Sequence, residues 1–239
     1  MISFDISQWR AWAPGLQTPD DWQAWASGAP LVPADGQAPD VSFLPAMQRR
    51  RLSYLARMAF SVGWPLAEGQ APMPLVFVSR HGETPRTFSI LSELAEGQAL
   101  SPTQFSLSVH NAVIGLWSIM RGETSEMTAL AAAGDGFEQG LLEAAALLHE
   151  GAPAVLLIVA EEQPPEIYRP WVDDVPFAYA VGLRVTAGQQ WQLSPQPATA
   201  HTPRTPLPHA LSWLQASLAG AHSLTHTWKR RAWNWQRQP

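Results

Sequence analysis

The chain has 239 residues, no cysteine and a formal net charge of −5. Without cysteine it cannot form disulfides, thiolate metal sites or a thioester on a cysteine nucleophile. Only 15% of its residues are charged. That fraction is low for a surface that faces water everywhere, and it favours a chain that gives part of its surface to a partner.

Charge is spread unevenly along the chain. No Asp or Glu follows Asp174, and that last segment carries six Lys and Arg residues, so residues 1–174 must hold a net charge of −11. A basic C-terminal third favours an acidic partner. Lys229 is the only lysine, whereas a nucleic-acid surface usually carries several, so we predict no nucleic-acid partner.

The N-terminus begins with an alternating polar stretch rather than with a basic and then apolar leader. No apolar run reaches the length that crosses a membrane. These features predict a cytoplasmic protein without a membrane span.

The N-terminal part predicts a strand and two helices. Residues 1–9 alternate between apolar and polar side chains, which is typical of a strand. A short helix is expected to begin after the N-cap residue Thr18 and to end near Gly28. Residues 45–64 carry apolar side chains at helical spacing and predict one continuous helix. The arginine triplet near its start, residues 49–51, is interpreted as a solvated face, with a carrier-protein contact as the functional alternative.

Strands and helices alternate from residue 74 to residue 161. Residues 74–78 and 154–161 are apolar almost throughout, as expected of strands buried on both faces, and residues 85–96 predict a helix. This alternation predicts an α/β fold with a parallel sheet segment. Beyond it, residues 178–186 and 189–193 predict two outer strands, residues 209–219 a helix and residues 226–236 one closing strand.

The stretch over residues 100–150 predicts helix, strand and helix. Ser101 can cap a helix whose first residue is Pro102. Residues 112–120 are apolar nearly all round, so that segment should be a helix buried on every side, in a core or against another subunit. Residues 127–133 predict a strand buried on both faces. A Gly-Asp-Gly turn then leads into a helix over residues 137–149.

That turn has the form of a site but holds no nucleophile. A strand, a tight turn and a helix N-terminus together favour negative charge, yet no Ser, Thr or Cys stands at residues 134–136. We expect Asp135 to cap the helix through the N–H group of Phe137 or Glu138. A carboxylate stabilised in this way is a poor general acid.

The same stretch resembles the N-terminal half of a β-ketoacyl synthase, the condensing enzyme of fatty-acid and polyketide synthesis. That family carries a motif of the type Ser-x-x-Asn-x-x-x-Gly-x-x-Ser-Ile on a helix at its dimer interface, followed by a strand and the catalytic cysteine. The motif is matched at Ser108, Asn111, Gly115, Ser118 and Ile119. Residues 79–112 are similar to a subgroup of stand-alone N-terminal halves that are described as chain-length factors of aryl-polyene clusters.

The resemblance implies a thiolase-like fold, with a mixed sheet flanked by helices, in a single truncated domain over residues 1–239. It places the family's cysteine at about Gly134, so that Gly134 and Asp135 form a vestigial elbow, and it implies that the chain stops before the half with the two catalytic histidines. Such a subunit is expected to be catalytically silent and to use no cofactor and no metal.

The resemblance also implies partners. The chain is expected to form a heterodimer with a full-length β-ketoacyl-acyl carrier protein synthase and to shape the acyl tunnel of that synthase. An acyl carrier protein is a further candidate partner. Gln104, Phe105 and Leu107 are expected to wall the tunnel and set chain length. His110, Asn111, Val113 and Trp117 are expected at the dimer interface.

A rival interpretation rests on the tetrapeptide Arg80-His81-Gly82-Glu83. It resembles the motif of histidine phosphatases, in which His81 would accept a phosphoryl group beside an arginine clamp. His110 or His149 would then have to serve as the second histidine of that family. A third interpretation is a free-standing binding or scaffold protein with a basic C-terminal face.

Two further pairs of residues have spacings that bear on a site. His222 and His226 have the i, i+4 spacing of a metal pair on a helix, but their segment predicts a strand and contains no acidic residue. Glu161 and Glu162 are consecutive on a predicted strand and should point to opposite faces, so they do not form a catalytic carboxylate pair.

Overall fold

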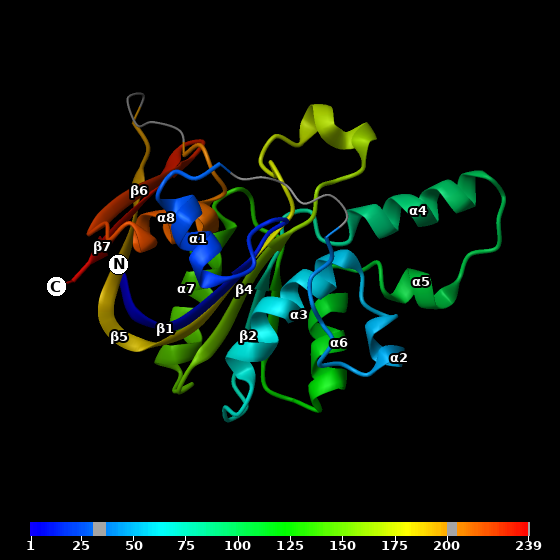
Figure 1. Ribbon diagram of the computed structural model, residues 1–239, viewed down its shortest axis with the longest axis horizontal. Helices are drawn as coiled ribbons and strands as arrows, with labels where there is room; N and C mark the ends of the chain where they lie inside the picture. Colours follow the sequence, from blue (N-terminus) through cyan, green and yellow to red (C-terminus); the bar gives the residue numbers. More distant parts are fainter. Residues whose placement is uncertain (31–36, 200–204, 239) are drawn as a thin grey trace.

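The computed structural model describes residues 1–30, 37–199 and 205–238. These residues form one mixed sheet with helices on both faces (Figure 1). The strands are β1 (Ile2–Trp12), β2 (Leu75–Val78), β3 (Met127–Leu130), β4 (Val155–Glu161), β5 (Tyr179–Pro197), β6 (Ser223–Trp228) and β7 (Arg231–Arg237). They lie in the order β3-β2-β4-β5-β7-β6, and β1 pairs with β5 beside them.

The helices are α1 (Pro19–Ala26), α2 (Ala46–Arg49), α3 (Tyr54–Ala67), α4 (Thr84–Ala95), α5 (Pro102–Ser106), α6 (Ala112–Arg121), α7 (Gly136–His149) and α8 (His209–Leu218), with a 3-10 helix, η1 (Glu166–Trp171). None of the helices in the described ranges is long and apolar enough to cross a membrane.

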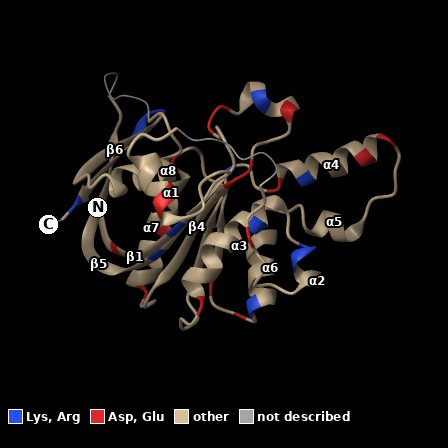
Figure 2. Ribbon diagram, viewed as in Figure 1, with Lys and Arg blue, Asp and Glu red and all other residues tan. Residues whose placement is uncertain are grey.

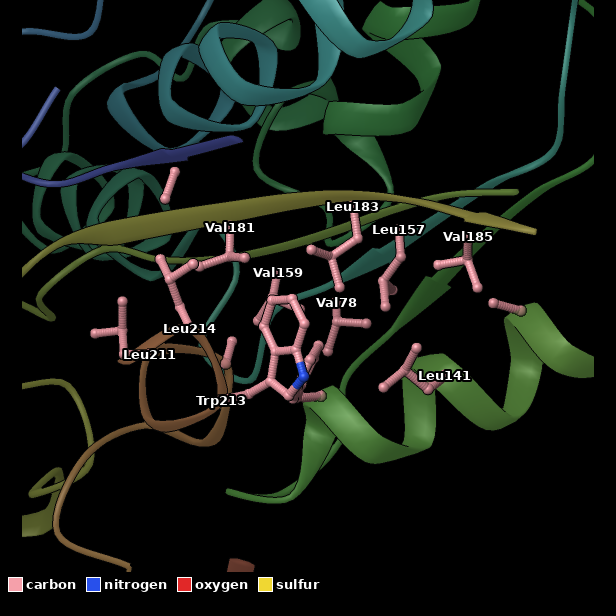
Figure 3. Packing of buried hydrophobic residues seen from close by; sticks show 14 of the residues in the cluster. Val78, Leu141, Leu157, Val159, Val181, Leu183, Val185, Leu211, Trp213 and Leu214 are labelled. Carbon is pink, nitrogen blue, oxygen red and sulfur yellow. The ribbon is translucent and has the colours of Figure 1, made fainter. Parts of the chain in front are cut away.

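The centre of the sheet is parallel, which confirms the predicted α/β class. β2 pairs in parallel with β3 on one side and with β4 on the other. Every residue of β2 and β4 is buried. Alternate residues of β4 enter different cores: Leu157 and Val159 pack with α7 and α8 (Figure 3), whereas Leu156 and Ile158 pack with α3 and α6. The continuous apolar run of this strand follows from burial on both faces.

α3 approaches the sheet closely at a glycine. A Cβ atom at Gly63 would lie 2.4 Å from Cδ1 of Ile158 and 3.1 Å from the ring of Trp117. No real Cβ contact is as short as the first, so a larger residue would push α3 away from β4 and α6. The missing side chain therefore sets the spacing between α3, α6 and the sheet.

The prediction of one helix over residues 45–64 is wrong. The segment forms α2 and then α3, which runs past that range to Ala67. α2 ends at Arg49, and Ser53 is extended; its side-chain hydroxyl accepts a hydrogen bond from the backbone N–H of Ala56 and so caps α3. Such a cap starts a helix, and the apolar spacing alone hides this second start.

Two predictions in the central stretch are also corrected. α6 is buried on one face only, and Gly115 and Ile119 on its other face are exposed. The strand predicted over residues 127–133 ends at Leu130, and its residues are only partly buried. β3 lies at the edge of the sheet and pairs with β2 alone among the described strands, so one of its sides lacks a neighbour.

The C-terminal strands differ from the prediction as well. The two outer strands predicted over residues 178–193 belong to the single 19-residue strand β5. The closing strand predicted over residues 226–236 is a hairpin of β6 and β7, which turns at Lys229, a residue with φ of +54°. This turn contains no Gly, Pro, Asn or Asp, the residues that usually mark a hairpin, so the sequence conceals it.

An arm formed by α4, α5 and their connections extends away from the sheet (Figure 1). Residues 97–120, which continue through α6, contain no Asp, Glu, Lys or Arg, and α5 is uncoloured in the charge view (Figure 2). Large apolar side chains are nevertheless exposed on the arm and α6: Leu91, Leu94, Leu100, Phe105, Val109 and Ile119.

Candidate functional site

The turn between β3 and α7 is covered by the C-terminal hairpin. A Cβ atom at Gly134 would lie 2.4 Å from both Cε3 and Cζ3 of Trp228, at the end of β6. Gly134 does not adopt a positive φ, so its backbone would accept any residue. The space would not, because the indole ring of Trp228 already fills it.

Asp135 does not cap α7, contrary to prediction: its side chain makes no hydrogen bond to the helix N-terminus. The fully buried carboxylate accepts two hydrogen bonds from Arg231, from Nε at 2.6 Å and from Nη2 at 2.7 Å, and a third from Trp233 Nε1 at 3.1 Å. Burial would raise the pKa of Asp135, but hydrogen bonds from Arg231 and Trp233 outweigh burial and leave that pKa below its usual value.

One turn further along α7, Glu138 joins three elements. Its carboxylate is buried and lies 2.7 Å from His209 Nδ1 of α8 and 2.6 Å from His226 Nδ1 of β6. Trp235 Nε1 donates a third hydrogen bond at 3.3 Å. Burial disfavours the charged form of Glu138, yet the two histidines lower its pKa to about 2. The carboxylate is therefore charged at neutral pH.

The pKa values of the two histidines are shifted in opposite directions, although Glu138 raises both. Burial lowers the pKa of His209, but attraction to the Glu138 carboxylate outweighs burial and raises the pKa overall. Burial dominates at His226, and the nearby charge of His209 adds to it, so the pKa of His226 is lowered. Glu138 and His209 thus favour each other's charged forms, whereas burial favours the uncharged form of His226.

Glu138, His209 and His226 are also the described residues that could hold a metal ion, since one ligand atom from each lies within 4.8 Å of the others. Tetrahedral zinc would hold its ligand atoms roughly 3.3 Å apart. The separations of 2.6 and 2.7 Å between carboxylate and imidazole are hydrogen-bond lengths. His222 and His226, whose spacing alone is typical of a metal pair, are separated as the predicted strand requires: His222 is exposed and precedes β6, whereas His226 is buried within it.

A second polar group lies where β2 and β4 end. The buried Glu161 carboxylate accepts hydrogen bonds from the hydroxyl of Ser79 at 3.2 Å, from the backbone N–H of His81 at 3.3 Å and from the backbone N–H of Arg80. Burial is the largest influence and raises the pKa of Glu161 to about 7, against these hydrogen bonds. Asp174 pairs with the guanidinium of Arg80 and lies 3.2 Å from His81 Nε2.

In this geometry the arginine and the histidines that a phosphatase would need are engaged in other contacts or lie elsewhere. Arg80 and His81 are both held by Asp174, an anion where a phosphate would have to bind. His110 Nε2 lies 2.7 Å from the carbonyl oxygen of Ser79 and is occupied by that contact. His149 is the last residue of α7, at the end of the helix that points away from this group.

Residues 22–236 match the family model described as "Beta-ketoacyl synthase, N-terminal domain". The chain belongs to this family. A comparison with curated protein sequences finds no match.

Solved structures agree with this ketosynthase fold. The chain is similar to a chain in "Ketosynthase (ApeO) in Complex with its Chain Length Factor (ApeC) from Xenorhabdus doucetiae", with 32% sequence identity, a TM-score of 0.89 and coverage of 99% of this chain and 100% of that one. It also resembles the ishigamide ketosynthase/chain length factor, with 13% identity, a TM-score of 0.60 and coverage of 92% and 74%. A β-ketoacyl synthase from Burkholderia phymatum gives 12% identity, a TM-score of 0.60 and coverage of 93% and 71%.

The ketosynthase motif divides between the two faces of α6. Asn111, Gly115 and Ile119 are spaced four residues apart and are all exposed. Two residues predicted at the interface, Val113 and Trp117, pack inside the chain instead, where their exposed fractions are 2% and 1%. His110 is partly buried and holds the end of β2 through Ser79.

The residues predicted to line an acyl tunnel lie on the arm. Gln104 is exposed and accepts a hydrogen bond from Arg86 of α4 at 2.8 Å. Phe105 is 63% exposed, and Leu107 is partly buried against the core beside α6. The three residues therefore lie in or directly after α5, and Phe105 has a largely exposed ring.

Sequence reasoning missed the cluster around Glu138 and the role of Arg231. The partners are 71 to 98 residues apart in the chain, so no local pattern joins them. One signal was available: Glu138 precedes Leu141 and Ala144 by three and six residues, on the apolar face of a helix. A buried carboxylate requires cationic or hydrogen-bonding partners, and the C-terminal third supplies them.

Proposed function

We propose that this chain is a catalytically silent chain-length-factor subunit, which forms a heterodimer with a full-length β-ketoacyl-acyl carrier protein synthase and shapes its acyl tunnel. The observation that carries the proposal is the end-to-end similarity, at 32% identity, to a chain of a ketosynthase–chain length factor complex. The present chain has no cysteine, so it cannot be the subunit that holds an acyl thioester. The role that remains is that of the chain length factor.

The elbow supports catalytic silence. If the family's cysteine aligns with Gly134, this position offers no nucleophile, and the neighbouring Asp135 is neutralised by Arg231. A carboxylate bound by three donors and with a lowered pKa is a weak base. The residues around the turn therefore stabilise the fold and do not supply a reacting group.

The exposed face of α6 supports a heterodimer. Gly115 lies in the middle of the helix, and a Cβ atom there would meet nothing within 4 Å. Glycine in a helix costs about 0.5–1 kcal/mol relative to alanine, and no contact with the described residues explains its presence. A partner helix packed closely against this position would explain why it is a glycine. Ile119, 68% exposed one turn later, supplies the apolar contact for the same surface.

The free edge of β3 and the arm extend this surface. An unpaired strand edge readily pairs with another chain, and β3 follows α6 directly in the sequence. Leu100, Phe105 and Val109 form an uncharged, apolar continuation. We propose that Gln104, Phe105 and Leu107 reach the partner's tunnel, while His110, Val113 and Trp117 hold α6 in position and Asn111 contacts the partner.

The remaining parts of the proposal concern organisation and further partners. The single sheet of the described residues supports one domain over residues 1–239. The basic C-terminal third and the triplet Arg49 to Arg51 are suited to an acidic carrier protein. A cytoplasmic location suits such an assembly, because acyl carrier proteins and their synthases meet there.

Co-expression with a full-length synthase tests the heterodimer. We expect a one-to-one complex on size-exclusion chromatography with mass determination, and condensing activity that is lost when the cysteine of the synthase is changed. The matched pair of variants is Ile119→Asp on α6 and Ile167→Asp on η1, since both side chains are exposed. Only the first should prevent co-elution. A chain that remains monomeric beside several such synthases would overturn the proposal.

A further inference from the structure

The elbow of this subunit is filled by a side chain of its own. The ring of Trp228 lies over Gly134, and three of its atoms would stand 2.4 to 2.7 Å from a Cβ atom at that position. Such separations lie far inside van der Waals contact. The place where any nucleophilic side chain would project from the turn is therefore already taken.

The hairpin fixes Trp228 in this position. In β6 and β7, His226 is paired with Trp233 and Trp228 with Arg231, so these four side chains share one face of the hairpin. His226 is bound to Glu138, and Arg231 and Trp233 are bound to Asp135. Both acids belong to the start of α7. The contacts of His226, Arg231 and Trp233 thus lie on either side of Trp228 in the hairpin and hold its ring against the turn that precedes α7.

Two cations hold the ring from outside the turn. The guanidinium of Arg80 lies 5.3 Å from the ring centroid of Trp228, and Nζ of Lys229 lies 5.8 Å from it. Both separations are within the range of cation–π attraction. The indole N–H has no hydrogen-bond partner among the described residues, so the position of the ring depends on shape and on these contacts.

The ring also borders a cavity. Val78, Phe137, Val159, Tyr179 and Leu207 are apolar residues that line it, and Gly134 and Trp228 line it too. Arg80, Glu161 and Asp174 supply a polar side. Without the indole, the space above Gly134 would join this cavity and enlarge it by the volume of the missing ring.

We propose that Trp228 is a built-in plug, which occupies the pocket at the elbow and excludes any acyl or aryl group from this subunit. The proposed lack of catalysis at this elbow then has two independent causes: the nucleophile is absent, and the space for its substrate is filled. The inference concerns this chain's own elbow and holds whether or not the chain pairs with a synthase. Restoring a thiol at Gly134 would not restore an accessible site.

The absence of cysteine gives a clean test on the full-length chain, because Gly134→Cys would introduce its only thiol. We expect Gly134→Cys to lower the thermal midpoint by at least about 4 °C in the presence of Trp228, since overpacking is destabilising. In the Trp228→Ala background the same change should cost less than about 1 °C. Alkylation of the new thiol by iodoacetamide should be at least about tenfold faster in the double variant. Gln236→Cys, exposed on β7 of the same hairpin, provides the reference rate.

A second measurement covers the case in which Gly134→Cys fails to fold. Indole, the excised part of the side chain, should bind Trp228→Ala and raise its thermal midpoint by about 3 °C at ten times its dissociation constant. The wild-type chain and Trp171→Ala, which removes an exposed tryptophan, should not respond. The plug is refuted if indole leaves Trp228→Ala unchanged, or if Gly134→Cys costs the same in both backgrounds.

Discussion

Glu162 is a residue whose surroundings disfavour its charge. Burial raises the pKa of its carboxyl group to about 7, and the nearby negative charge of Glu83 adds to the effect. Because the ordinary value is 4.5, the folded state binds a proton more tightly than the unfolded state. The contribution of Glu162 protonation to the free energy of unfolding is therefore fully present below about pH 4.5 and is lost as the pH rises through 7.

We predict that Glu162→Gln removes part of this pH dependence. The thermal midpoint of the wild-type chain should fall between pH 5 and pH 8 by more than that of the variant, although Glu161 titrates near pH 7 in both. Thermal unfolding followed by circular dichroism at both pH values measures the difference. Glu68→Gln, at an exposed position, is the control and should keep the wild-type slope. Equal slopes in all three proteins would contradict the assignment.

Phe105 is the residue through which the proposed tunnel can be tested. Its ring is largely exposed on α5 and would form the end wall of a partner's cavity, so its removal should leave more room for a growing chain. Phe105→Ala should therefore lengthen the products of the reconstituted synthase, measured by mass spectrometry of the released acyl chains. Ile167→Ala removes a similarly exposed apolar side chain on η1 and should leave product length unchanged. Identical products from Phe105→Ala and the wild type would remove Phe105 from the tunnel.

At the scale of elements, the start of α7 is joined to α8 and to the C-terminal hairpin by Glu138. We predict that Glu138→Gln destabilises the chain by about 3–5 kcal/mol, because breaking a buried ion pair leaves its partner uncompensated. Glu150→Gln, at the exposed C-terminal end of the same helix, should cost less than about 0.5 kcal/mol. Urea unfolding of both variants gives the comparison. A small effect at Glu138 would mean that packing alone holds the hairpin.

The same element has a predicted acid response. The folded-state pKa of Glu138 is about 2 and its ordinary value is 4.5, so its stabilisation is present above pH 4.5 and is lost as the pH falls towards 2. The raised pKa of His209 and the lowered pKa of His226 act in opposite directions near neutral pH. The sharpest loss of stability in the wild type should accordingly lie below pH 4.5, and it should be smaller in Glu138→Gln.

In α6, the stability of the isolated chain and the affinity for a partner favour different residues at position 115. Gly115→Leu should stabilise the isolated chain by up to about 1 kcal/mol, because glycine is the poorer helix former and a Cβ atom at this position would meet no described atom within 4 Å. The same variant should weaken the heterodimer at least tenfold, since the added side chain would separate the helix from its partner. Urea unfolding measures the gain in stability, and a binding titration with the synthase measures the loss of affinity. A variant that binds the synthase as tightly as the wild type would place the interface elsewhere.

For the whole molecule, the sequence predicts those features that depend on neighbours along the chain. The sequence predicts β2, β4, α4 and α7, because burial on both faces gives apolar runs and because helices repeat at 3.6 residues. The division of α2 from α3 and the β6–β7 turn were missed, since Ser53 and Lys229 carry weak local signals. The pairs Asp135–Arg231 and Glu138–His226 were inaccessible to local patterns, because tertiary packing alone brings them together.

The distribution of charge and apolar surface over the whole molecule predicts its dependence on a partner. Residues 97–120 are uncharged and contribute exposed apolar side chains, and a surface of this kind favours association. A ligand that binds only the folded state stabilises it by about 2.7 kcal/mol at one hundred times its dissociation constant. For a chain of this size, that free energy corresponds to a rise in thermal midpoint of roughly 5–11 °C.

We therefore expect the thermal midpoint of this chain to rise progressively as the synthase is titrated in. Ile119→Asp should abolish the rise without lowering the midpoint of the isolated chain by more than about 2 °C, and a midpoint indifferent to the synthase would show that the apolar surface serves another partner.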